Sequence, residues 1–307
     1  MDGERTLSSC GAIGPVMRLI IHPGLHKTGS TYLQHVLNDT SRALTEKGVW
    51  YERQRGYPAH HGAAWRILIG DPKPLIRMGE KAEQAGCETL ILSSEDLEGA
   101  LYDDRPLAAI ERAVGDCGID TVEWHVVLRD PGQAFASLFA QLQHHVYADA
   151  FQLFYDVMRR GFVHMAAPMP DAGTPYWHYA FDHLADLERL KQRTGAQVVA
   201  HDFAAEEAFP GAPLLRHLDC AGAIEKLPGP AARNARPARE DIIRGFVERV
   251  AEAVPDTEGQ RQVTEGFLAC LESGLANVST YAELVGARYA ASHRGALERF
   301  GVDASPT

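Results

Sequence analysis

The chain has 307 residues, 45% of them hydrophobic, which is enough to bury one large core or two modest ones. Its formal net charge of −11 disfavours nucleic acid and anionic lipid as partners, because both require a basic surface. Five scattered cysteines without a C-x-x-C pair predict neither a disulfide framework nor a zinc site. We find no signal-peptide pattern and no apolar run of membrane-spanning length in the sequence. We therefore expect a cytoplasmic protein with no membrane span, which binds any anionic ligand at a local site.

Short apolar runs alternate with helical patterns through the first two thirds of the chain. Five such runs predict strands, at residues 17–22, 49–51, 89–93, 122–128 and 197–201. Helices are predicted between them, at residues 30–47, 77–85, 107–114, 134–146 and 177–194. Because parallel strands need crossover connections, this alternation favours a mainly parallel sheet of about five strands with helices on both faces.

The last third of the chain has only helical patterns, at residues 212–221, 239–253, 265–276 and 280–300. We divide the chain into an N-terminal extension (1–16), an α/β domain (17–223) and a helical C-terminal region (224–307) packed on that domain. The predicted fold class is α/β, with ligands beyond the C-terminal ends of the strands.

The first predicted strand is followed by a glycine-bounded loop and a helix start, in the run His22-Pro23-Gly24-Leu25-His26-Lys27-Thr28-Gly29-Ser30-Thr31. Gly24 and Gly29 allow backbone turns that point several N–H groups inward, and the helix start adds partial positive charge. Lys27 supplies a full positive charge, while Ser30 and Thr31 can donate hydroxyl hydrogen bonds. This arrangement predicts a phosphate-binding loop; the alternative is a glycine-rich turn without a ligand.

The lysine is displaced relative to the loop of nucleoside-triphosphate-binding proteins. In that loop, G-x-x-x-x-G-K-[ST], lysine follows the second glycine, whereas Lys27 stands two positions before Gly29. The run from His26 to Thr31 resembles the loop of P-loop sulfotransferases, the bacterial ones in particular. The resemblance implies 3′-phosphoadenosine 5′-phosphosulfate (PAPS) as the sulfuryl donor. Its 5′-phosphosulfate is then expected to contact the loop residues His26, Lys27, Thr28, Gly29, Ser30 and Thr31.

A second motif, Val126-Val127-Leu128-Arg129-Asp130-Pro131, ends the fourth predicted strand. In sulfotransferases, an arginine at this place and a serine eight residues later bind the 3′-phosphate, and Arg129 and Ser137 have this spacing. A planar guanidinium suits a phosphate because it can donate two parallel hydrogen bonds. The alternative is a surface pair of Arg129 with Asp130. A weaker family likeness at residues 231–236 implies a third nucleotide contact, through Arg233 and Asn234; the alternative for Arg233 and Arg236 is a solvated loop.

Sulfuryl transfer also needs a base that takes the proton from the acceptor hydroxyl or amine. Glu95 follows the third predicted strand, where cytosolic sulfotransferases have a histidine, and we favour it. Glu52 follows the second strand, near the glutamate used by other members of the family. The doublet His60-His61 precedes a helical pattern and resembles a histidine of the bacterial relatives. The sequence leaves these candidates open.

Three functions follow from these motifs. The first is sulfuryl transfer from PAPS to an acceptor, either a small molecule or a saccharide, with no metal expected because the leaving phosphate is held by Lys27 and the loop amides. The second is a P-loop kinase using ATP and magnesium, with residues 90–96 ending in a metal-binding acid. The third is a non-catalytic nucleotide-binding module. The shifted lysine favours the first.

Overall fold

A five-stranded parallel sheet forms the centre of the protein. The computed structural model describes residues 17–143, 149–166, 173–205, 209–220, 222 and 238–302. The strands are β1 (Met17–His22), β2 (Val49–Tyr51), β3 (Thr89–Ser93), β4 (Ile119–Leu128) and β7 (Gln197–Asp202), in the order β2-β3-β1-β4-β7. All four pairings are parallel. Since β1 lies between β3 and β4, the loop that follows β1 emerges at the middle of the sheet edge where ligands bind.

Helices cover both faces of this sheet. One face packs on α3 (His61–Leu68), α4 (Lys73–Gln84), α5 (Asp104–Cys117), α8 (His183–Thr194) and the end of α11 (Thr257–Phe300). The other face packs on α1 (Ser30–Asp39), α2 (Ser41–Thr45) and α9 (Ala212–His217). This three-layer arrangement confirms the α/β fold class and the parallel sheet expected from the alternating pattern.

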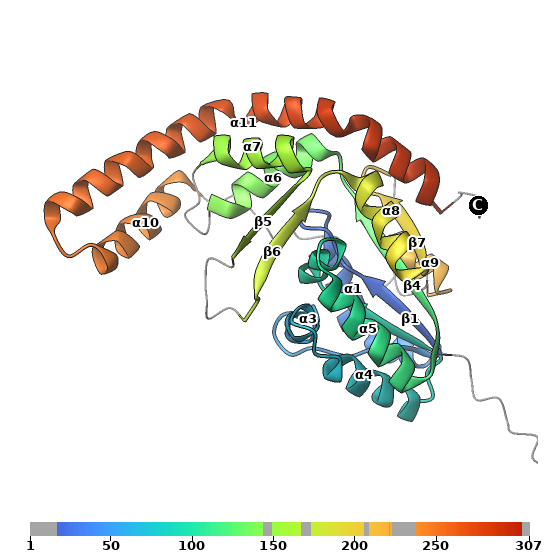
Figure 1. Ribbon diagram of the computed structural model, residues 1–307. Helices are drawn as coiled ribbons and strands as arrows, with labels where there is room; N and C mark the ends of the chain where they lie inside the picture. The colour runs from blue at the N-terminus through green and yellow to red at the C-terminus, as the bar shows by residue number, and fades with distance from the viewer. Residues whose placement is uncertain are drawn as a thin grey trace, which may run out of the picture.

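A third apolar cluster lies beside the sheet, around an antiparallel pair of strands. It joins α6 (Pro131–Leu142), α7 (Ala150–Arg160), β5 (Phe162–Ala166), β6 (Tyr176–Ala180) and α11. Figure 1 shows α11 as a long helix that runs over α7 and α6 and reaches the C-terminus near β7. Its beginning packs against α10 (Arg239–Ala253), with Phe246 stacked on Phe267.

The predicted strands lie where expected, but several helix predictions were wrong in extent. The expected helix at 30–47 is interrupted at Thr40, where both the backbone N–H and the hydroxyl donate to the Val36 carbonyl. The expected helix at 177–194 begins only at His183, because the aromatic run Tyr176–Ala180 pairs with β5 as a strand. The helices expected at 265–276 and 280–300 are parts of the single helix α11.

Other differences are smaller or concern elements that were not predicted. The helix expected at 212–221 ends at His217, and Asp219 takes a left-handed backbone conformation beyond it. Neither α7 nor β5 was predicted. Among the helices that the structure describes, none has both the length and the apolar composition needed to cross a membrane.

Candidate phosphate-binding site

The loop between β1 and α1 is held in a conformation that only particular residues allow. Gly24 has φ 46° and Gly29 has φ 75°, and a Cβ at Gly24 would lie 2.9 Å from the Cβ of Ser30. Lys27 has φ 68°, a conformation that costs a residue with a side chain about 1–2 kcal/mol. Strain of this kind is retained where surrounding contacts fix it, as at many ligand sites. The sequence therefore builds a tight loop that presents Lys27 at the edge of the sheet.

The start of α1 can accept an anion. The first N–H groups of any α-helix have no partner within the helix, and they carry its partial positive charge. Here the N-cap residue is Gly29, which has no side chain to cap them, and the first turn contains no acidic residue. The hydroxyl of Thr28 donates to the carbonyl of Leu25 inside the loop, at 2.5 Å. The loop thus folds on itself and leaves the helix N-terminus uncapped by a side chain.

Two cations meet at this loop. Nη1 of Arg129, directly after β4, donates to the Lys27 carbonyl oxygen at 2.8 Å, and its guanidinium lies 4.8 Å from the centre of the Phe203 ring. Its buried Nε has no hydrogen-bond partner in the structure. Partial burial lowers the pKa of Lys27, and Arg129 lowers it further, whereas Glu95 opposes the shift. Bringing an anion to the loop would offset the repulsion between the two cations.

Glu98, in the short helix that follows β3, anchors the loop. One carboxylate oxygen accepts from the backbone N–H of His26 at 2.9 Å and contacts Nδ1 of the same residue at 2.7 Å. The other oxygen accepts from the Ala180 N–H in β6. The His26 ring also packs edge-on against Tyr179, at 4.6 Å between centroids. Glu98 therefore ties the loop between β1 and α1 to the β5–β6 pair.

A small cavity lies behind the loop, lined by His26, Thr28, Glu98, Arg129, Leu138 and Tyr179 among others. Its volume of about 20 Å³ is enough for roughly one water molecule. A nucleotide does not fit in this space.

Further acidic and aromatic side chains lie beside the loop, near the end of β3. The hydroxyl of Ser30 donates to a carboxylate oxygen of Glu95 at 2.8 Å. Nδ1 of His61 lies 2.6 Å from Oδ2 of Asp96, which also accepts from Nε1 of Trp65 at 2.7 Å. Tyr57 connects the two groups, because its ring packs on His61 and its hydroxyl lies 3.2 Å from that of Thr31.

The contacts of His61 change its acidity. Burial lowers the pKa of this imidazole, but the hydrogen bond and charge of Asp96, together with the charge of Glu95, outweigh burial and raise it above the ordinary value of 6.5. Asp96 holds Nδ1, which leaves Nε2 as the nitrogen able to accept a proton. A carboxylate that orients a histidine in this way is a typical general-base pair.

Two other base candidates have different partners. The Glu52 carboxylate pairs with Lys81 on α4. Nε2 of His60 lies 2.9 Å from the Glu52 carbonyl oxygen, and its Nδ1 accepts from the Ser93 N–H at 3.1 Å. Burial lowers the pKa of His60 to about 4 despite the opposing effect of Glu52. His60 thus holds the ends of β2 and β3 together, and neither side chain contacts the loop through these bonds.

The remaining predicted nucleotide contacts are less informative. Ser137 lies half-buried on α6, one position before Leu138, which faces the cavity. Arg233, Asn234 and Arg236 lie outside the described residues. Sequence reasoning did not single out Tyr57 or Glu98, and it considered Asp96 only as the acid that ends residues 90–96 in the kinase alternative. Three of the four residues from Glu95 to Glu98 are acidic, which is the only signal that the sequence offered, and the structure buries both Asp96 and Glu98.

The chain matches no family model, no curated protein and no solved structure. Its function must therefore be argued from the geometry and chemistry of this loop and its flanks.

Proposed function

We propose that the protein is a PAPS-dependent sulfotransferase that acts on a small-molecule or saccharide acceptor. The observation that carries the proposal is the loop itself. Lys27 stands between two positive-φ glycines, at the uncapped start of α1 and at the ligand edge of a parallel sheet. An anion there would meet helix amides and a full positive charge together.

The residues of the loop fit the 5′-phosphosulfate group. The amides at the start of α1 and the ammonium of Lys27 would bind its oxygens, while Arg129 braces the loop through the Lys27 carbonyl. In sulfuryl transfer, the acceptor oxygen attacks sulfur and the bond from sulfur to the bridging phosphate oxygen breaks. Negative charge then develops on the leaving phosphate, and fixed donors at that place lower the barrier. Lys27 is the side chain proposed to supply this stabilisation.

The contacts favour His61 over Glu95 as the base that takes the acceptor proton. Glu95 already accepts a hydrogen bond from Ser30 and lies near Lys27, so its carboxylate is engaged by the loop. His61 has one nitrogen held by Asp96 and a raised pKa, so its free nitrogen is the better proton acceptor near neutral pH. We assign Glu95 the role of orienting Ser30.

One observation favours the alternative of a P-loop kinase. The Ser30 hydroxyl and the Glu95 carboxylate lie 2.8 Å apart, and a hydroxyl with a carboxylate after a neighbouring strand is how many P-loop enzymes hold magnesium. Counted from Gly24 and Gly29, however, Ser30 occupies the lysine position of that motif and Thr31 the magnesium position. Thr31 contacts Tyr57, which cannot replace a carboxylate there. Kinase activity would be lost in EDTA, whereas sulfuryl transfer is expected to persist.

A variant of Arg129 tests whether the protein recognises the 3′-phosphate of the nucleotide. If it also binds the 3′-phosphate, Arg129→Ala is expected to weaken 3′-phosphoadenosine 5′-phosphate by about 10- to 150-fold, the value of a charged hydrogen bond of roughly 1.5–3 kcal/mol. Adenosine 5′-phosphosulfate lacks the 3′-phosphate and is expected to bind almost as well as before. Titration calorimetry with both ligands measures the difference. Equal weakening of the two would limit Arg129 to bracing the loop at Lys27.

A further inference from the structure

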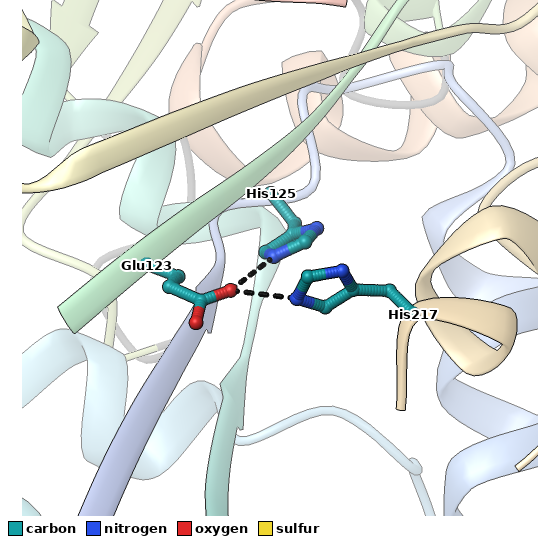
Figure 2. A group of neighbouring side chains, drawn as sticks. All are labelled: Glu123, His125 and His217. Carbon is teal, nitrogen blue, oxygen red and sulfur yellow. Dashed lines mark hydrogen bonds and ion pairs between the residues drawn. The ribbon is translucent and has the colours of Figure 1, made fainter. Parts of the chain in front are cut away.

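A second cluster of polar side chains lies on the sheet face covered by α9, away from the phosphate loop. Figure 2 shows the rings of His125 and His217 pointing at the same carboxylate oxygen of Glu123. Nε2 of His125 lies 3.1 Å from this oxygen and Nε2 of His217 lies 2.8 Å from it. All three atoms lie within 4.8 Å of one another. Glu123 and His125 are buried, whereas 33% of the His217 side chain is exposed.

We propose that Glu123, His125 and His217 bind a zinc ion or a similar divalent transition metal. Two imidazole nitrogens and one carboxylate oxygen are the donor types that zinc prefers. Bonds of about 2.0–2.1 Å in a tetrahedral arrangement place ligand atoms roughly 3.3 Å apart. The distances from the Glu123 oxygen to Nε2 of His125 and to Nε2 of His217, 3.1 and 2.8 Å, are only a few tenths of an ångström shorter than this value. Because His217 is partly exposed, water can reach the fourth position.

The fold positions these ligands from two elements, β4 and α9. Glu123 and His125 are two residues apart on β4, so they project from the same face, and α9 ends at His217 above them. Nδ1 of His125 lies 3.0 Å from Nε2 of His201 on the neighbouring strand β7. A metal-bound histidine usually has such a partner, which fixes its ring orientation. Arg18 lies 3.5 Å from the second oxygen of Glu123 and offsets part of its charge.

The cluster is separate from the proposed transfer site. Arg129 follows Glu123 by six residues, so the extended strand puts about 20 Å between these two residues along β4. The metal would instead link α9 to β4. The segment leading into α9 packs on the loop, since a Cβ at Gly29 would lie 2.9 Å from Cγ of Pro210. A metal at His217 would therefore hold this segment on the phosphate loop without entering the reaction.

Zinc titration of EDTA-treated, dialysed full-length protein tests the site, with a chelator competition assay for affinity. The wild-type protein is expected to bind one zinc ion and to melt at higher temperature when zinc is present. His217→Ala is expected to weaken binding by at least about 100-fold, because it removes a direct ligand. Glu123→Gln is expected to weaken it comparably, and Co²⁺ in place of zinc should give the intense visible absorption of a four-coordinate ion only in the wild type.

His293→Asn is the matched control, because His293 contacts another histidine, His183, at 3.1 Å. It is expected to bind zinc like the wild type. His217 is partly exposed, so its variant is expected to fold, and an unchanged circular dichroism spectrum verifies this. Zinc binding of equal affinity in His217→Ala, or no saturable binding by the wild type, would overturn the proposal. The cluster would then be a carboxylate held by two histidines and Arg18.

Discussion

Replacing Lys27 by alanine is expected to leave the fold intact and to lower sulfuryl-transfer turnover by about 10²–10³-fold. This is the usual loss when one donor to developing charge is removed. Lys27 has a positive φ, so alanine keeps the backbone strain but not the ammonium group. Lys27→Gly removes both, and it is expected to be about as slow, because charge and not strain governs the rate.

The measurement is single-turnover transfer from radiolabelled PAPS, with Lys191→Ala as the control. Lys191 is exposed on α8, and its removal is expected to leave the rate unchanged. Near-normal turnover in Lys27→Ala would remove this side chain from the mechanism. If Lys27→Ala is slow but Lys27→Gly turns over at the wild-type rate, the loss of rate in Lys27→Ala would be due to backbone conformation and not to the missing charge.

Replacing His61 by asparagine is expected to slow transfer to a hydroxyl acceptor by roughly 10²–10⁴-fold, the range for loss of a general base. The base must be neutral to accept a proton, so the wild-type rate should rise with pH through the pKa of His61. Burial lowers this pKa, but the opposing effect of Asp96 and Glu95 is larger. The midpoint of the pH–rate profile should therefore lie above 6.5. This acidic limb is expected to disappear in His61→Asn.

Asp96→Asn is a second variant for the same experiment, and it tests the partner of His61. It removes the charge that raises the pKa of His61, so the acidic limb should move to lower pH while the maximum rate falls. Glu95→Gln is expected to keep an acidic limb, moved to lower pH, because Glu95 raises the pKa of His61 but is assigned to orienting Ser30 and not to taking the proton. A limb that is lost in Glu95→Gln and kept in His61→Asn would return the role of base to Glu95, the residue favoured by sequence position.

The sheet and the position of the loop between β1 and α1 were predictable because both are encoded locally. Each strand of the sheet is a short apolar run next to a helical pattern, and the loop is continuous from Gly24 to Ser30. The β5–β6 pair was not predictable in the same way. Tyr176–Ala180 is an aromatic run directly before a true helix, and only its pairing with β5 makes it a strand.

The flanks of the site depend on contacts between distant residues. Glu98 lies 72 positions after His26, and Asp96 lies 35 positions after His61, so no local pattern connects them. Glu52 follows β2 as the sequence indicated, but Lys81 on α4 pairs with its carboxylate. The Glu123 cluster depends in the same way on His217, which is 94 positions away.

Titration calorimetry with 3′-phosphoadenosine 5′-phosphate, in buffer containing EDTA, tests the central claim most directly. The protein is expected to bind one equivalent saturably, with binding weakened in Lys27→Ala, because the loop supplies the charge that holds the 5′-phosphate. ATP with magnesium, titrated in parallel without EDTA, is expected to bind more weakly. Absence of binding by 3′-phosphoadenosine 5′-phosphate, together with tight magnesium-dependent binding of ATP, would contradict the account and identify the loop as that of a kinase.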